Sequence, residues 1–113
     1  MAVELLVADE FARWFEWLAA ADEEVAREVV GGVEAYASAT SRSDEPKFDV
    51  CISCSGRLAF VAANVDGVVF LAAGAEIDGS GRRAMTLVSR ARKITRRMRQ
   101  GRLALVPWKD FAR

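Results

Sequence analysis

The chain contains no histidine in its 113 residues. Histidine is the commonest general base near neutral pH and the commonest protein ligand of metals, so its absence removes the simplest routes to acid–base catalysis and to a metal centre. No phosphate-binding glycine loop, nucleophile elbow or close pair of carboxylates takes its place. The sequence therefore indicates no cofactor and no metal.

Cysteine occurs only twice, as Cys51 and Cys54 of a lone CxxC motif. A zinc site needs four ligands, and the chain has no further Cys and no His to complete one. Residues three apart in a strand point to opposite faces, so a role as small core residues is favoured over a redox role or a metal site shared between chains. Because no secretory signal leads the chain, we expect a cytoplasmic protein with free thiols.

Long apolar runs are also missing. No run approaches the roughly 20 residues that span a bilayer, so we expect no membrane association. Hydrophobic residues nevertheless make up 52% of the chain, which suffices for one core without disulfides or metal. We therefore expect a single domain over residues 1–113, in which residues 103–113 form a C-terminal tail.

Charge is balanced overall but divided between the two halves of the chain. Residues 1–50 hold twelve Asp and Glu against four Lys and Arg, and residues 51–113 hold four against twelve. The net charge of zero therefore combines −8 in one half with +8 in the other. The total argues against general attraction to nucleic acid, while the distribution leaves local attraction open.

The basic charge is concentrated between Gly81 and Arg102. This stretch holds nine Lys and Arg residues, and no acid occurs between Asp78 and Asp110. Gly101 is typical of a residue that ends a helix. Apolar residues recur at intervals of three and four, which predicts a helix with one buried face. That face comprises Ala84, Leu87, Val88, Ala91, Ile94 and Met98.

Two interpretations of this basic helix are open. Charged outer faces are common on solvated helices, and the arginines can simply keep the helix in solution. Like charges at i and i+4, such as Arg92 and Arg96, repel each other, however, and a polyanion or an acidic protein would relieve that repulsion. Candidate contacts to RNA phosphate or to an acidic partner are Arg90, Lys93, Arg96 and Arg97.

The N-terminal part predicts a strand followed by a helical hairpin. Ala2–Val7 is β-prone, and Asp9 and Asp22 are candidate caps of the two helices that follow. Trp17 lies off the apolar stripe of its helix, so it is either exposed or in contact with a partner. Apolar stripes predict faces buried against a sheet: Phe11, Trp14, Phe15 and Leu18 in the first helix, and Val25, Val29, Val33 and Tyr36 in the second.

The remaining part predicts three strands, a loop and an apolar tail. The strands are Lys47–Ser53, Arg57–Asn64 and Val68–Ala73, with a hairpin turn over residues 65–67 and a loop over Gly74–Gly79. The tail run Leu103–Val106 either covers the sheet or lies along a partner. The whole predicts an α+β fold, with the N-terminal strand and helical hairpin packed on an antiparallel sheet of three or four strands, and a C-terminal basic helix.

This order of elements resembles the RelE/ParE/HigB superfamily of bacterial toxins. In Val3–Val29 an acidic, aromatic helix with the pair Trp14-Phe15 precedes an acidic second helix, which resembles the opening of HigB-type toxins. Gly74–Gly79 resembles the Gly-Gly-Asp-Lys-Thr-Gly turn of one branch of the family. The resemblance extends over roughly residues 3–100.

The resemblance implies a RelE-like domain that acts as the toxin of a type II toxin–antitoxin system and pairs with a cognate antitoxin. It implies binding to RNA or the ribosome; many members cleave messenger RNA there with basic residues, and ParE-type relatives instead poison gyrase. This chain departs from the pattern at three positions that are basic in the family, where it holds Cys51, Ala59 and Ile77. The usual cationic sheet surface is therefore apolar or small here.

Messenger RNA cleavage without a general base must depend on positioning and on arginines that stabilise phosphate charge. The catalytic candidates for that role are Arg57, Arg82 and Arg83. One alternative is a catalytically silent module of the same fold, whose basic helix binds an acidic antitoxin or another acidic protein. Another is a homodimer in which the acidic half of one copy meets the basic half of the other.

Overall fold

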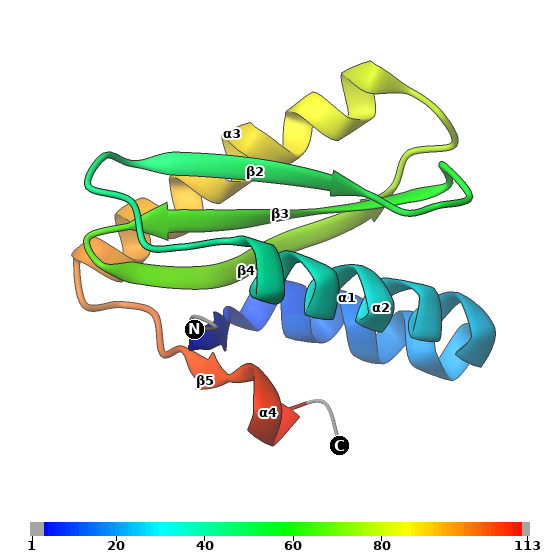
Figure 1. Cartoon of the computed structure of the whole chain (residues 1–113), viewed down its shortest axis with the longest axis horizontal. Coiled ribbons are helices and arrows are strands. Elements are labelled where there is room, and N and C mark those ends of the chain that lie inside the picture. Colours follow the sequence, from blue (N-terminus) through cyan, green and yellow to red (C-terminus); the bar gives the residue numbers. More distant parts are fainter. Residues whose placement is uncertain (1–3, 112–113) are drawn as a thin grey trace.

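The structure is a computed structural model that describes residues 4–111, so Ala2 and Val3 of the predicted first strand lie outside the described residues. The described part forms a five-stranded sheet and four helices (Figure 1). The architecture is α+β, as the sequence predicts. The elements in chain order are β1 (Leu5–Val7), α1 (Asp9–Ala21), α2 (Glu23–Ala39), β2 (Lys47–Ile52), β3 (Leu58–Val65), β4 (Val68–Glu76), α3 (Gly81–Arg99), β5 (Val106–Pro107) and α4 (Trp108–Phe111).

The sheet is mixed, with the strand order β2-β3-β4-β1-β5. Strands β2, β3 and β4 pair antiparallel, but β1 pairs parallel with β4, and β5 pairs antiparallel with β1. The predicted antiparallel sheet of three or four strands is therefore wrong in the pairing of β1 and in the strand count. Leu5 and Val7 are almost fully buried, and an apolar strand of this kind is best accommodated between two neighbours rather than at an edge.

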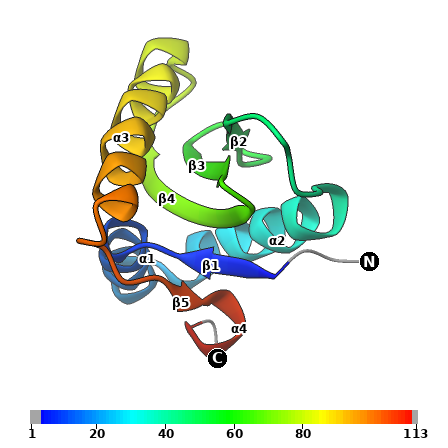
Figure 2. The same cartoon turned by 90° about the vertical axis from the view of Figure 1, so that its left-hand side faces the viewer.

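Helices cover both faces of the strongly twisted sheet. Figure 2 shows α3 along one face and α1 and α2 along the other. Alternate residues of β3 point into the two layers of the core. Leu58, Phe60 and Ala62 pack with α1 and α2. Ala59, Val61 and Ala63 pack with α3. Both β3 and the middle of β4 are buried throughout, so the prediction of a doubly buried strand at Val68–Ala73 is confirmed for all but Val68.

Large side chains fill the layer between α1, α2 and the sheet. Phe11 is fully buried and lies edge-on to Phe60 at 6.2 Å between ring centroids. Trp14 lies directly on Gly74 of β4, where an added Cβ would come within 2.3 Å of the indole ring. Only glycine therefore permits this approach of helix to strand.

The predicted stripes of the helical hairpin are confirmed for four residues that are buried: Phe11, Leu18, Val29 and Val33. The other members are only partly buried, which corrects the expectation for Trp14 and Phe15. Phe15 lies at the rim of the core, where the C-terminal segment rather than the sheet covers it. Trp17 is exposed over 61% of its surface.

The C-terminal tail packs on its own chain, with Leu103 and Leu105 against the core that α3 shares with the sheet. β5 extends the sheet beyond β1, and α4 then places aromatic rings on α1. The ring centroid of Phe15 lies 6.0 Å from that of Trp108 and 5.7 Å from that of Phe111. Aromatic pairs at these separations are favourable, so the tail packs against the core as a partly buried layer.

The predicted cap at Asp22 is confirmed, and the one at Asp9 is wrong. The carboxylate of Asp22 accepts hydrogen bonds from the backbone N–H groups of Glu24 (3.1 Å) and Val25 (3.3 Å). α1 instead begins at Asp9 itself, after Ala8, whose N–H donates to the carbonyl of Leu71 at 2.9 Å. Asp9 therefore lies in the first turn, and its carboxylate is available to a more distant partner.

The predicted turn before β4 is confirmed, whereas the predicted loop after β4 begins later than expected. Asp66 and Gly67 have φ of 53° and 77°, as a two-residue hairpin turn requires, so that turn is confirmed. The predicted loop at Gly74–Gly79 is wrong in its first half, because β4 continues to Glu76 in register with Leu58 of β3. The loop begins at Ile77, which is buried.

Candidate functional site

The basic stretch forms α3, which both of its ends specify locally. The hydroxyl of Ser80 caps the helix by accepting a hydrogen bond from the N–H of Arg83 at 3.2 Å. At the other end, Gly101 has φ of 69° and its N–H donates to the carbonyl of Met98. Arginines in the last turn complement the partial negative charge of the helix C-terminus. α3 is followed by β5 and α4, so it is not the C-terminal element.

One side of α3 is buried against the sheet. Ala84, Leu87, Ala91 and Ile94 are buried as predicted, while Val88 and Met98 are only half-buried. At about 100° per residue, the remaining positions divide into an outer side and two flanks. One flank faces the start of α1, and the other faces β2. The four predicted contact residues do not share one side.

The flank that faces α1 is neutralised by the chain's own carboxylates, and we call it the closed flank. The guanidinium of Arg90 binds Glu10 through Nε at 2.9 Å and Nη2 at 2.6 Å, and Arg97 binds Asp9 at 3.3 Å. Arg90 and Arg97, which were predicted to contact a polyanion, are thus engaged by carboxylates of α1. Both side chains are half-buried, so their ion pairs are screened less than pairs in open solvent.

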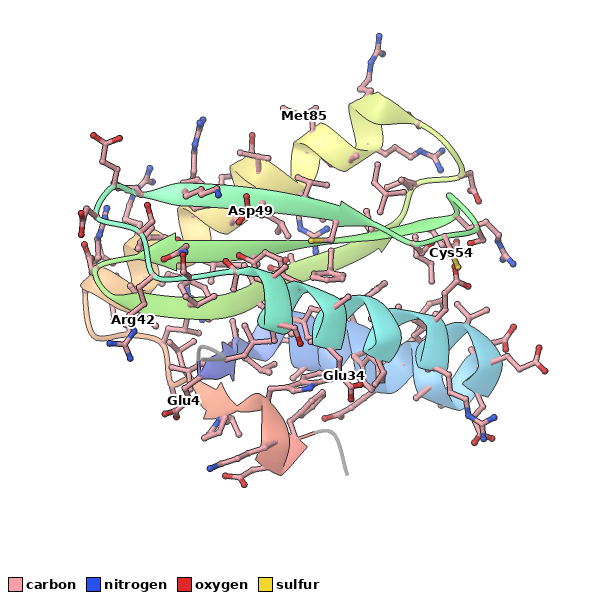
Figure 3. All side chains as sticks on the ribbon, in the orientation of Figure 1. Glu4, Glu34, Arg42, Asp49, Cys54 and Met85 are labelled. Atoms are coloured by element: carbon pink, nitrogen blue, oxygen red, sulfur yellow. The ribbon has the colours of Figure 1, made fainter. Side chains whose placement is uncertain are left out.

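The outer side of α3 carries cations that remain unpaired. Arg82, Lys93 and Arg96 are exposed and make no ion pair with any carboxylate in residues 4–111. Arg96 lies at the boundary between the outer side and the flank that faces β2, and we count it with that flank below. Met85 lies among them, exposed over 63% of its surface on the outside of the helix (Figure 3). Two of the four predicted contact residues, Lys93 and Arg96, therefore face solvent as expected.

The flank that faces β2 contains a groove of about 270 Å³, and we call it the open flank. Arg92 lies over the ring of Phe48 with its guanidinium carbon 5.8 Å from the centroid, and within residues 4–111 it has no carboxylate partner. Arg99 binds Asp66 through Nε at 2.8 Å. The groove is lined by Pro46, Phe48, Arg92, Thr95, Arg96 and Arg99.

Three polar groups at the open flank lie in unusual surroundings: Asp66, Arg99 and Thr95. The hydrogen bond from Arg99 lowers the pKa of Asp66 and raises the pKa of Arg99 itself, so the pair stays ionised. The hydroxyl of Thr95 is buried and has no hydrogen-bond partner within the described part of the chain, which is unusual for a buried polar atom. Sequence reasoning missed this groove, because nothing local in the sequence places Phe48 beside α3.

The catalytic candidates Arg57, Arg82 and Arg83 lie toward the other end of α3, near its N-terminus. The loop after β4 joins the start of β3 there, since the N–H of Ile77 donates to the carbonyl of Arg57 at 2.7 Å. Arg57 lies 3.9 Å from Glu76, and Arg83 lies 3.5 Å from Asp78. These exposed pairs are weak, and a carboxylate beside each guanidinium opposes an incoming phosphate.

The cysteines occupy the far end of the β2–β3 hairpin. Cys54 lies exposed in the turn, where its thiol donates to the carboxylate of Glu28 at 3.4 Å (Figure 3). The N–H of Ser55 also donates to Glu28 and lowers the pKa of that carboxyl group. Cys51 is half-buried, and burial raises the pKa of its thiol to about 11. The expectation of two core cysteines is therefore wrong for Cys54, because the strand ends at Ile52.

The described residues contain neither a metal-binding cluster nor a membrane-spanning helix. No group of three or more Cys, Asp or Glu side chains in residues 4–111 is arranged to hold a metal ion. None of the four described helices has both the length and the apolar character needed to cross a bilayer. In comparisons with known proteins, the chain matches no family model, no curated protein and no solved structure.

Proposed function

We propose that this protein has a RelE/HigB-like domain, acts as the toxin of a type II toxin–antitoxin system, and binds RNA or the ribosome through α3. The observation that carries the proposal is a set of exposed cations on one helix that no carboxylate in residues 4–111 neutralises: Arg82, Arg92, Lys93 and Arg96. Their charges repel one another, and phosphate bound against them removes that repulsion.

The length of α3 also suits a polyanion. The helix has 19 residues, which at 1.5 Å per residue is about 28 Å, so cations along it can contact several phosphates of one strand. The proposal concerns binding. Cleavage would require Arg57 and Arg83 to exchange Glu76 and Asp78 for a phosphate, and it would proceed without a histidine base.

The test is induced expression in bacteria, with growth and messenger RNA integrity followed together. The parent is compared with the variant Arg82→Gln/Lys93→Gln/Arg96→Gln. A matched control, Arg13→Gln/Arg27→Gln/Arg42→Gln, removes the same charge from exposed positions on other elements. We expect growth arrest with the parent and the control, and relief with the α3 variant. Absence of arrest by the parent, together with no RNA binding at low salt, would refute the proposal.

A second candidate function is a catalytically silent module that binds an acidic antitoxin or another acidic protein. The observation that favours it is the edge strand β2, whose outer edge is unpaired in the described structure. Unpaired edges readily accept a strand from another chain, and Ile52 at the end of β2 is 58% exposed. If a neighbouring gene encodes a small acidic protein, its binding by the parent but not by the α3 variant, in the absence of RNA binding, would support this candidate.

The homodimer suggested by the charge asymmetry is less favoured than either candidate. The pairs Arg90–Glu10 and Arg97–Asp9 already join the basic half of the chain to its acidic half within one molecule. Less charge of each sign therefore remains to attract a second copy. Sedimentation at low and high salt checks this point, and we expect a monomer in both.

A further inference from the structure

The open flank of α3 combines charge and an aromatic ring in one hollow. It is lined by the partly buried side chain of Phe48 from β2, by Pro46 and by residues of α3. Three arginines from successive turns of α3 border it. Single-stranded nucleic acid is bound by the same combination, in which a basic groove follows the backbone and π-faces stack on the bases.

The three arginines differ in which atoms of the guanidinium group are left to bind a ligand. Arg96 is exposed and has no carboxylate partner in residues 4–111. Arg99 uses Nε and Nη2 for Asp66, at 2.8 and 3.4 Å, so its third nitrogen is left for another acceptor. Arg92 lies over the ring of Phe48, and a guanidinium plane stacks on bases as well as on aromatic side chains.

We propose that this groove holds one nucleotide of a single-stranded RNA, with its phosphate on Arg96 and Arg99 and its base against Arg92 and Phe48. The identity of the ligand class depends on the proposed function; the site adds Phe48, Arg92 and Arg99 to Arg96, which was predicted from the sequence. The volume of about 270 Å³ is close to the lower end of small-molecule pockets, which matches one nucleotide better than a folded element.

An acidic peptide would satisfy the arginines equally well, since guanidinium groups bind carboxylate and phosphate with the same fork geometry. It would not use the ring of Phe48 below Arg92, however. RNA uses both features of the groove, and for this reason it is the occupant we favour. The ring of Phe48 is therefore the feature that separates the two ligands.

The experiment measures binding of a short fluorescent oligouridine by anisotropy over a range of salt concentrations. Phe48→Leu keeps an apolar side chain and the charge but removes the ring, and we expect it to weaken binding about fivefold or more. Phe15→Leu, on the opposite layer of the molecule, is the matched control and should leave binding unchanged. Circular dichroism verifies that both variants are folded.

A pair of double variants tests the charges of the groove. Arg92→Gln/Arg96→Gln removes two groove cations, and Arg82→Gln/Lys93→Gln removes two cations outside it. We expect the groove pair to weaken binding at least tenfold more than the outer pair. Each phosphate contact that is lost lowers the log–log salt slope by about 0.7.

The outcomes separate failure of the groove from failure of the function. If the parent binds RNA but Phe48→Leu has no effect and the two double variants are equivalent, the groove proposal is overturned and RNA binding by α3 stands. If the parent does not bind RNA at low salt, both fail. If poly-L-glutamate displaces RNA at equal charge concentration and Phe48→Leu has no effect, the groove binds acidic protein instead.

Discussion

The two flanks of α3 carry the same kind of residue and have opposite properties. On the closed flank, Arg90 and Arg97 are bound to Glu10 and Asp9 of α1. On the open flank, Arg92 and Arg96 have no carboxylate partner in residues 4–111 and border a groove. The difference is caused by what lies opposite: the acidic first turn of α1 on one side, and the apolar residues of β2 on the other.

A cluster of basic residues in a sequence therefore does not show how much positive charge the folded protein can offer to a phosphate. A paired and half-buried guanidinium must break an existing interaction before it binds phosphate, whereas an exposed one only displaces water and counterions. Function is therefore expected from the residues that the fold leaves unpaired.

The largest loss of stability is expected from a change in the packing of α3 against the sheet, because the positions of both flanks depend on it. Leu87 lies on the inner side of α3 and is fully buried. Leu87→Ala should therefore lower the free energy of unfolding by about 2–5 kcal/mol through the cavity it creates. Chemical denaturation measures this loss. A loss below about 1 kcal/mol would mean that α3 is not held by its apolar stripe, and the division into flanks would then fail.

The closed flank should contribute measurably to stability through its ion pairs. A double-mutant cycle with Arg90→Gln and Glu10→Gln should give a coupling energy of about 0.5–1 kcal/mol, because the two side chains are 40% and 31% exposed and only partly screened. The exposed pair Arg27–Glu23, at 75% and 76%, is the matched control and should give less. Equal coupling in the two cycles would show that Arg90 is as free as a surface residue.

The open flank should become a better anion site when Asp66 is neutralised. The hydrogen bond from Arg99 lowers the pKa of Asp66 below its ordinary value of 3.8. Above pH 3.8 the carboxylate is therefore charged, and its pairing with Arg99 stabilises the fold. This stabilisation is lost as the pH falls through the lowered pKa. Asp66→Asn removes the pairing at every pH, and asparagine tolerates the φ of 53° found there.

We expect Asp66→Asn to raise affinity for the labelled oligouridine about twofold to fivefold, because the guanidinium of Arg99 becomes fully available to phosphate. Asp78→Asn is a closely matched control. Asp78 also has a positive φ, of 46°, and it also faces an arginine of α3, but at the other end of the helix. An equal rise in both variants would indicate a general charge effect and would remove the distinction of the groove.

The sequence predicted those parts of the molecule that depend on short-range patterns. The buried stripe of α3, the cap at Asp22 and the turn at Asp66-Gly67 each follow from residues a few positions apart. Parallel pairing of β1 with β4, and the return of the tail as β5, involve segments more than thirty residues apart with no local signature.

The candidate site was predicted in part for the same reason. Lys93 and Arg96 are exposed because of their position on the helix, which periodicity specifies. The pairing of Arg90 with Glu10 spans 80 residues, and the approach of Phe48 to Arg92 requires the assembled sheet. The opposite charges of the two halves were a signal that ion pairs would form between them, but not of which residues would form them.

The most direct test of the account compares RNA binding by two double variants with the same change in charge. Arg92→Gln/Arg96→Gln alters the open flank, and Arg90→Gln/Arg97→Gln alters the closed flank. The account predicts that the open-flank variant weakens oligouridine binding at least tenfold and flattens its salt dependence, whereas the closed-flank variant mainly lowers the melting temperature. Equal loss of RNA affinity in the two folded variants, or a larger loss in the closed-flank variant, would contradict it.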